Sequence, residues 1–448
     1  MQLRNVIDSP CGLRHLLDGL EVQSGFTRRW LLEMPMMTQA NEIEACHGML
    51  KRFVHFINDT DKIHLDTLLF RLQGLKDIRT TIGNLGRHAV LDDIELFEVK
   101  HLSLLATEVN RLLAQHGMDD VVEIPSMDDI IHILDPDGLN MAAFYIYDSY
   151  CEPLKELRAR MRQHPEQQDK LLLQAKELED EVRQQLSQRL SPFAPLIERA
   201  QLALAQIDLN MAKALQMRQW GLTLPTISDD GTCRYRDLFH PQVKEALERR
   251  NRQFQPVDIA FGHEPTLITG ANMGGKTVVL KALTLCQYLF QFGFGVPAGQ
   301  AVIAIKDEIH FCIGDEQSIE KGLSSFAAEM KNIDAVITAS RQGKKLLALI
   351  DEPARTTNPT EGAALVTALL RVLDGKGLSL VMTTHYDIDP EHTHRLRVTG
   401  FDNGRMNYQL VEVDDGEVPH EALAIARSLG IDNQWLDTAQ RLLHGDKD

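Results

Sequence analysis

The stretch LITGANMGGKTVVL, from Leu267 to Leu280, contains residues that could bind the phosphates of a nucleotide. An apolar run leads into a glycine-rich loop, the loop ends in a Lys-Thr pair, and an apolar pattern with helical spacing follows. Residues 270–277 fit the spacing G-x-x-x-x-G-K-[ST] between an expected strand and an expected helix, as that motif requires. Glycines let successive backbone N–H groups point at phosphate oxygens, and the start of a helix adds the positive end of its dipole. The predicted nucleotide-binding residues of the loop are Gly270, Asn272, Met273, Gly274, Gly275, Lys276 and Thr277.

Two of these residues carry distinct chemistry. Lys276 can reach the β- and γ-phosphates, and the Thr277 hydroxyl can be a ligand of Mg²⁺. The stretch LLALIDEP adds Asp351 and Glu352 at the end of an expected buried strand. Asp351 is placed to hold Mg²⁺ through water, and Glu352 is placed to orient or deprotonate an attacking water. Because the pair follows such a strand downstream of the loop, we predict an ATP site with Mg²⁺.

A further strand is expected in LVMTTHYD, and it ends near His385. A histidine at the end of a strand is often only structural. His385 would lie beside the γ-phosphate if its strand neighbours the strands that lead into the loop and into Asp351. Its role therefore depends on the order of the strands in the sheet.

The bulk composition limits the classes of partner. The chain has 448 residues, enough for two or three domains, and its 47 Lys and Arg against 64 Asp and Glu give a formal net charge of −17. This charge argues against a wholly basic surface for nucleic acid, although a local basic patch stays possible. The six cysteines form no C-x-x-C pair, which favours free thiols in a reducing cytosol. With charges near the N-terminus and no long uncharged run, we expect a cytoplasmic protein with no membrane segment.

The elements that must position these residues fall into two halves. Helical spacing of apolar residues predicts helices over residues 43–57, 94–117 and 126–134, the last ending at the turn DPDG. Residues 145–190 are dense in charged residues and leucine. They predict two long exposed helices packed as an antiparallel pair, interrupted near His164 and Pro165.

The pattern changes near residue 220. Turn residues and short extended stretches come first, and then four short apolar runs alternate with helical patterns. This alternation predicts a largely parallel central sheet. The four runs are PTLITG, AVIAI, KLLALIDEP and LSLVMTTH.

These motifs, in their order, resemble the ATPase domain of the MutS family of mismatch-repair proteins. The resemblance rests on TLITGANMGGKTVVLKAL, GLSSFAAEM, LIDEPARTTNPTEGAAL and VMTTHY, and upstream on FTRRWLLEMP, QIDLNMAKA, FHPQV and FQPVDI. It covers about residues 20–445. It implies an α/β ATPase domain at 221–448, an ABC-type P-loop NTPase with a mostly parallel sheet and a C-terminal helical dimerisation segment. A mostly α-helical core and lever domain at 1–220 would precede it.

The resemblance also implies roles for single residues. Phe254 matches the aromatic residue that stacks on adenine, and Ser324 matches the serine that reaches the γ-phosphate bound by the other subunit. His385 matches the histidine after the switch strand, while Arg355 and Thr357 fall in the loop that crosses the dimer interface. Such a shared site implies a homodimer, or a heterodimer with a paralogous MutS-like subunit.

Departures from the family leave the client open. The chain begins almost at the helical core, so we expect it to lack the aromatic-x-Glu wedge with which the family's mismatch binders contact a mismatch. The stretch NPTEG looks more like the second MutS branch. The stretches LDPDGLNMAAFYIYDSY and VPHEALAIARSLGID resemble small MutS-like ATPases that reactivate cobalamin-dependent lysine or ornithine aminomutases. One hypothesis is an ATPase that opens and closes a helical arm on DNA without mismatch readout. The alternative is a chaperone-like ATPase for a protein client. The intact site residues argue against a third reading, a helical scaffold with a vestigial site.

Overall fold

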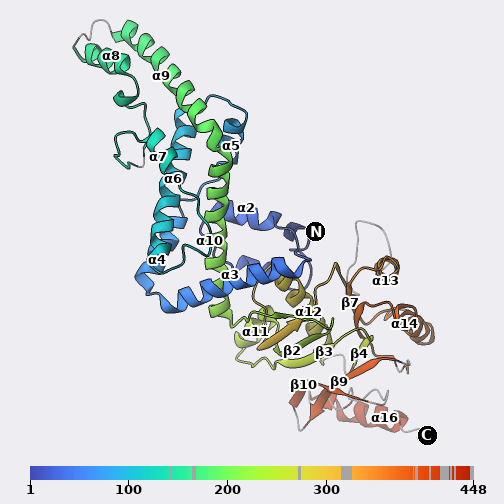
Figure 1. Ribbon diagram of the computed structural model, residues 1–448. Helices are drawn as coiled ribbons and strands as arrows, with labels where there is room; N and C mark the ends of the chain where they lie inside the picture. The colour runs from blue at the N-terminus through green and yellow to red at the C-terminus, as the bar shows by residue number, and fades with distance from the viewer. Residues whose placement is uncertain are drawn as a thin grey trace. The chain divides into compact units, whose positions relative to one another are not determined.

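Two units make up the chain (Figure 1). The computed structural model describes residues 1–141, 143–163, 168–270, 274–313, 325–386, 388, 392–402, 405–413, 423, 426–427 and 430–443. We call Leu20–Met34 with Gly48–Leu215 the helical unit, and Met1–Gly19, Pro35–His47 and Gln216–Asp448 the sheet unit. Two helices, α3 and α10, contribute residues to both units.

The helices of the helical unit follow the predicted spacing of apolar residues. The helices predicted over 43–57, 94–117 and 126–134 are confirmed as α3, α6 and α7, and α7 ends at the predicted turn. Helix α6 begins at a capping box, because the Asp92 carboxylate accepts from the Glu95 N–H and the Glu95 carboxylate accepts from the Asp92 N–H. The helices with residues in this unit are α2 (Gly25–Glu33), α3 (Ala40–Asp59), α4 (Lys62–Leu72), α5 (Arg79–Gly86), α6 (Asp93–Ala114), α7 (Asp128–Leu134), α8 (Glu152–Gln163), α9 (Gln168–Leu190) and α10 (Ala194–Trp220).

The charge-rich stretch forms the predicted helix pair, α8 and α9 (Figure 1). The Arg158 guanidinium, on α8, donates to Glu179 Oε1 of α9 at 2.8 Å. This contact holds the two helices side by side. The predicted interruption at His164 and Pro165 lies outside the described residues.

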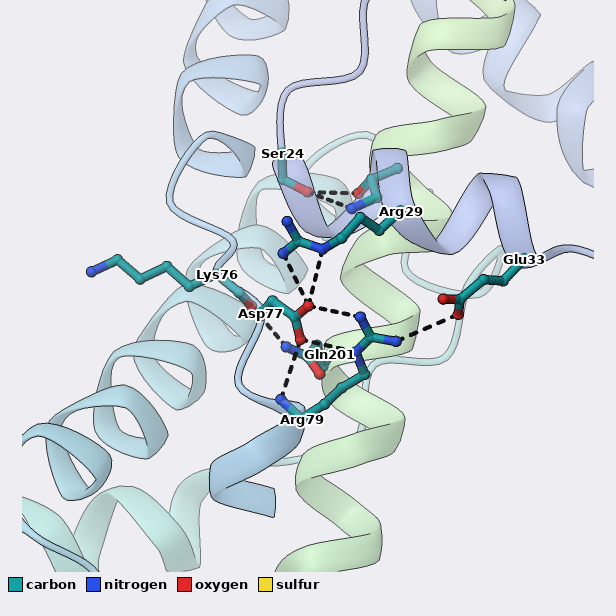
Figure 2. A network of polar contacts seen from close by, with 8 residues as sticks. Ser24, Arg29, Glu33, Lys76, Asp77, Arg79 and Gln201 are labelled. Carbon is teal, nitrogen blue, oxygen red and sulfur yellow. Dashed lines mark hydrogen bonds and ion pairs between the residues drawn. The ribbon is translucent and has the colours of Figure 1, made fainter. Parts of the chain in front are cut away.

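A network of polar contacts fixes α2 within the helical unit (Figure 2). Asp77, between α4 and α5, accepts from Arg29 of α2 at 2.9 Å and from Arg79 of α5 at 2.8 Å. Arg79 also lies 3.4 Å from the Glu33 carboxylate of α2. At the preceding residue, the Lys76 carbonyl accepts from Gln201 of α10 at 2.7 Å. The two arginines, acting first through the Arg79 hydrogen bond, lower the pKa of Asp77 to about 2.

Two sheets form the centre of the sheet unit. The larger has the order β10-β9-β4-β8-β7-β6, in which every neighbouring pair is parallel except β9 and β10. Its strands are β4 (Thr266–Thr269), β6 (Glu308–Ile313), β7 (Leu346–Asp351), β8 (Ser379–Thr383), β9 (His394–Asp402) and β10 (Arg405–Glu412). The smaller sheet, in the order β1-β5-β2-β3, contains β1 (Thr226–Ile227), β2 (Cys233–Leu238), β3 (Val257–Phe261) and β5 (Gln300–Ile303).

Every residue of β7 and β8 is buried, as expected when helices cover both faces of a parallel sheet. Buried residues of α13 and α14 form one apolar cluster with these strands. The helices of the unit, besides its parts of α3 and α10, are α1 (Leu13–Asp18), α11 (Pro241–Glu248), α12 (Lys276–Gln291), α13 (Ser325–Ser340), α14 (Pro359–Leu373) and α16 (Asn433–Leu443).

The sequence-based prediction of the strands needs one correction. AVIAI does form a strand, β5, but that strand belongs to the smaller sheet and pairs antiparallel with β2. A short apolar run indicates that a strand is buried. Strands of the larger sheet and of the smaller sheet both contain buried residues, so the run alone could not show to which sheet the strand belongs. Strand β6 was not predicted, although Glu308, His310 and Cys312 alternate with apolar residues along it. Among the described helices, none has the length and apolar character needed to span a bilayer.

Candidate functional site

The order of the larger sheet decides where the predicted site residues lie. Strand β8 pairs on one side with β4, which leads into the glycine loop, and on the other with β7, which ends at Asp351. The three carboxyl ends of these parallel strands therefore meet at one edge, the usual place for ligands in such sheets. His385 follows β8 at this edge, where it is half-buried and its ring centroid lies 4.3 Å from that of Tyr386. The condition that the sequence set for His385 is thus met, while its role stays a prediction.

The glycine loop has the backbone that its glycines permit. Gly270 has φ 125° and Gly275 has φ 74°, both in the left-handed region, and Gly275 is the N-cap of α12. A Cβ at Gly275 would lie 3.2 Å from Tyr408 Cδ1, so a side chain there would also be crowded. The predicted residues Asn272 and Met273 lie outside the described residues, whereas Gly274 is described and buried.

Lys276 is the first residue of α12, and its side chain is only 3% exposed. Its ammonium donates to the Gly270 carbonyl at 2.6 Å and lies 3.4 Å from Glu352 Oε1. Burial lowers the pKa of Lys276, and the negative charge of Glu352 opposes this shift. The cation is therefore held at the loop, at the place where the motif requires it.

Asp351 is fixed by two hydroxyl groups. Thr277 Oγ1 donates to Asp351 Oδ2 and Thr383 Oγ1 donates to Asp351 Oδ1, both at 2.7 Å. Hydroxyl and carboxylate oxygens are the hard ligands that Mg²⁺ prefers. Among the described residues, no group of three or more His, Cys, Asp or Glu could hold a metal ion. Mg²⁺ usually keeps several waters and binds phosphate oxygens beside one or two protein ligands. The sequence analysis did not predict Thr383. The feature that could have pointed to it is a hydroxyl-bearing residue directly after the apolar run LVM.

Glu352 has an unusual backbone. Its φ is 43°, and its N–H donates to Thr383 Oγ1 at 2.9 Å. Its carboxylate is 12% exposed and lies between the Lys276 ammonium and the Arg355 guanidinium, the latter at 3.7 Å. Non-glycine residues with positive φ are costly and concentrate at functional sites. The carboxylate is thus held at the same edge as Asp351.

A cavity of about 320 Å³ lies beside the loop. Its lining includes Gly274, Gly275, Phe254 and Tyr408, so the predicted adenine-stacking residue and the loop share one cavity. Tyr408, on β10, was not predicted, because β9 and β10 were not recognised as strands. Gln255 holds this strand in place: its Nε2 donates to Asn407 Oδ1 at 2.8 Å, and its Oε1 accepts from the Tyr408 N–H at 3.1 Å.

The residues assigned to a dimer interface are placed only in part. Ser324 lies outside the described residues. Arg355 and Thr357 are in the connection between β7 and α14, where the Arg355 side chain is 51% exposed. Thr357 Oγ1 lies 3.5 Å from Glu361 Oε2. Their part in an interface stays a prediction.

Part of the chain is similar to known proteins. Residues 266–414 match the model of MutS domain V. The chain is similar to Endonuclease MutS2 of Carboxydothermus hydrogenoformans, with 34% identity over 285 residues, 61% of this chain and 35% of that protein. It is similar to Endonuclease MutS2 of Caldicellulosiruptor bescii (35% over 216 residues, 48% and 26%). A third is Endonuclease MutS2 of Streptococcus gordonii (32% over 277 residues, 60% and 34%). The matches thus span about a third or less of these relatives.

Proposed function

We propose that this chain is a protein of the MutS family that binds ATP with Mg²⁺ at the edge of the larger sheet and hydrolyses it. The observation that carries this proposal is that one edge gathers the glycine loop, Lys276, the Thr277–Asp351 pair and Glu352. On this proposal, residues 221–448 are an ABC-type P-loop NTPase domain and residues 1–220 are its helical core and lever.

The residues present suit the nucleotide. A volume of about 320 Å³ lies within the ~300–1,000 Å³ that is usual for small-molecule sites, and Phe254 offers an aromatic face for adenine. Lys276 supplies a buried cation for the β- and γ-phosphates, and Thr277 with Asp351 would hold the metal. Mg²⁺ in this position neutralises negative charge on the phosphate oxygens.

Hydrolysis is assigned to Glu352 and His385. Glu352 would orient the attacking water and accept its proton, and His385 would lie beside the γ-phosphate. The resemblance adds Ser324 of a second subunit to the same site. We propose a dimer on this ground, formed by two copies or with a paralogue, with the C-terminal segment that includes α16 contributing to dimerisation.

We propose that nucleotide binding and hydrolysis close and open the dimer, and that the helical domain transmits this change to DNA. The relatives are named endonucleases, and the family resemblance is to mismatch-repair proteins. Both observations support DNA as the molecule on which this protein acts. No support for a protein client comes from the relatives named above. We also propose that the protein acts in the cytoplasm, where its six free cysteines would stay reduced.

Two variants test the ATPase directly. Lys276→Ala should abolish tight ATP binding in calorimetry, because the phosphates lose their fixed cation. Glu352→Gln should still bind ATP but hydrolyse it ~10²–10⁴ times more slowly, since an amide cannot accept the proton. Lys281→Ala, on the same helix α12, is the matched control and should behave as wild type. Unchanged ATP affinity in Lys276→Ala would refute the assignment of the loop.

A further inference from the structure

The connection that follows β7 contains a second strained residue. Ala354 has φ 61°, only two residues after Glu352 with φ 43°. Neither is glycine, so the surrounding structure must hold both in the left-handed region. Ala354 is 1% exposed, which means that its peptide groups cannot be satisfied by bulk water.

Two side chains from different elements hold Ala354. The Ala354 N–H donates to Glu329 Oε1, on α13, at 2.8 Å. The Ala354 carbonyl accepts from the Tyr386 hydroxyl, after β8, at 2.7 Å. One contact fixes the peptide plane before the Ala354 Cα and the other fixes the plane after it, so together they fix its φ and ψ.

The Tyr386 hydroxyl sits in a space that the fold keeps free for it. A Cβ added to Gly362, on α14, would lie 2.1 Å from this oxygen, so no other residue type fits there without a shift. The Tyr386 N–H donates to Thr384 Oγ1 at 3.1 Å, and the residue is buried. The ring is thus held from the backbone side as well as at its hydroxyl.

Glu352 depends on this arrangement because it lies between two fixed points. Its own N–H is held by Thr383 at the end of β8, and two residues later Glu329 and Tyr386 fix Ala354. The direction in which the Glu352 side chain leaves the backbone follows from these anchors. Without the contacts at Ala354, the backbone that follows Glu352 is held less firmly, and the carboxylate loses part of what orients it.

We propose that Glu329 and Tyr386 are positioning residues that hold the Glu352 carboxylate in place for hydrolysis. The proposal rests on the ATPase function proposed above. Neither residue needs to touch the nucleotide, so their loss should lower the rate of hydrolysis and leave ATP affinity unchanged.

The experiment compares Glu329→Ala, Glu329→Gln and Tyr386→Phe with wild type. Glu329→Ala and Tyr386→Phe should lower kcat by ~10–100-fold, the order expected when a reacting group is misplaced by about 1 Å. Glu329→Gln should retain most of the rate, because its amide oxygen still accepts from the Ala354 N–H. Hydrogen exchange of the Ala354 amide should become faster in Glu329→Ala and stay slow in Glu329→Gln.

Matched controls separate positioning from a general loss of stability. Asp334→Ala removes an exposed carboxylate from the same helix, α13. Tyr235→Phe removes a buried hydroxyl for which the described residues offer no hydrogen-bond partner. Both controls should keep the wild-type kcat.

Three outcomes would overturn the proposal. If Glu329→Ala and Tyr386→Phe both keep the wild-type kcat, the positioning role is refuted but the proposed ATPase function is not. Equal losses in Glu329→Gln and Glu329→Ala would show that the accepting oxygen is not what matters. If the wild-type protein hydrolyses no ATP, either alone or with a paralogous subunit added, the proposed function fails, and the positioning role falls with it.

Discussion

At the scale of single residues, hydroxyl groups fix the positions of the acidic residues in the candidate site. Each oxygen of Asp351 has its own donor, Thr277 for one and Thr383 for the other. The carboxylate cannot rotate without breaking one of these bonds, which leaves it a single direction toward the glycine loop. Thr383 also accepts from the Glu352 N–H, so one hydroxyl orders both acids.

Asp77 provides a prediction of pH dependence at the same scale. Its pKa falls from 3.8 to about 2 in the folded chain, so the folded state favours the charged form. This stabilisation is present above about pH 4 and is lost as the pH falls toward 2. It amounts to about 1–2 kcal/mol, allowing for the partial exposure of Arg29 and Arg79.

Asp77→Asn should therefore lose about 1–2 kcal/mol of local stability at pH 7, and roughly half of that difference at pH 3. Hydrogen exchange of the α2 amides measures this, because the network attaches α2. Asp129→Asn, an exposed residue of α7, should change nothing. A difference that stays constant from pH 7 to pH 3 would contradict the role given to the ion pairs.

At the scale of elements, Gly362 of α14 allows that helix to pack closely against Tyr386 in the segment after β8. Gly362→Ala should destabilise the sheet unit and displace Tyr386, because the new methyl group would meet the hydroxyl at 2.1 Å. Gly48→Ala is the matched control, since nothing lies within 4 Å of that position on α3. An alanine inside a helix should stabilise by about 0.5–1 kcal/mol over glycine. Thermal unfolding measures both, and equal melting temperatures for the two variants would refute the packing argument.

At the scale of the whole molecule, the shared site makes a prediction about mixed subunits. Ser324→Ala and Lys276→Ala proteins should each be nearly inactive alone. In a mixed dimer, the Ser324→Ala subunit supplies Lys276 and receives an intact Ser324 from its partner, so one complete site forms. Steady-state hydrolysis should then partly return on mixing.

The mixing experiment needs a control in which one subunit carries both substitutions. The double variant mixed with Ser324→Ala offers no complete site and should restore nothing. If wild-type homodimers are active and mixing the two variants restores nothing, each site lies within one chain. If a paralogue supplies the second subunit, this chain alone is inactive and the same mixing is done with that partner present.

DNA binding is the second prediction for the whole molecule. A duplex held through its phosphates must lose affinity steeply with salt, by orders of magnitude between about 50 and 200 mM for several contacts. Fluorescence anisotropy of a labelled duplex, with and without ATP, measures this slope. A net charge of −17 requires such contacts to come from a local group of basic residues. Absence of binding in every nucleotide state would exclude DNA as the client.

The sequence by itself determined the parts of this protein that depend on neighbouring residues. The glycine loop, the Asp-Glu pair after β7 and the helices α3, α6, α7, α8 and α9 were all predicted, because spacing and burial pattern are local properties. The same patterns gave the apolar runs that became β4, β7 and β8. The roles of the site residues are proposals.

Only the tertiary structure decided what depends on distant segments. Strand β8 lies between β4 and β7, and this order brings His385 and Thr383 to the edge where the glycine loop ends. The structure likewise packs two early segments into the sheet unit: the Met37 carbonyl accepts from Gln291, and the Cys11 carbonyl lies 3.0 Å from His240 Nε2. Periodicity records that a residue is buried but not what covers it. Strand order and contacts across hundreds of residues therefore leave no mark in a single sequence.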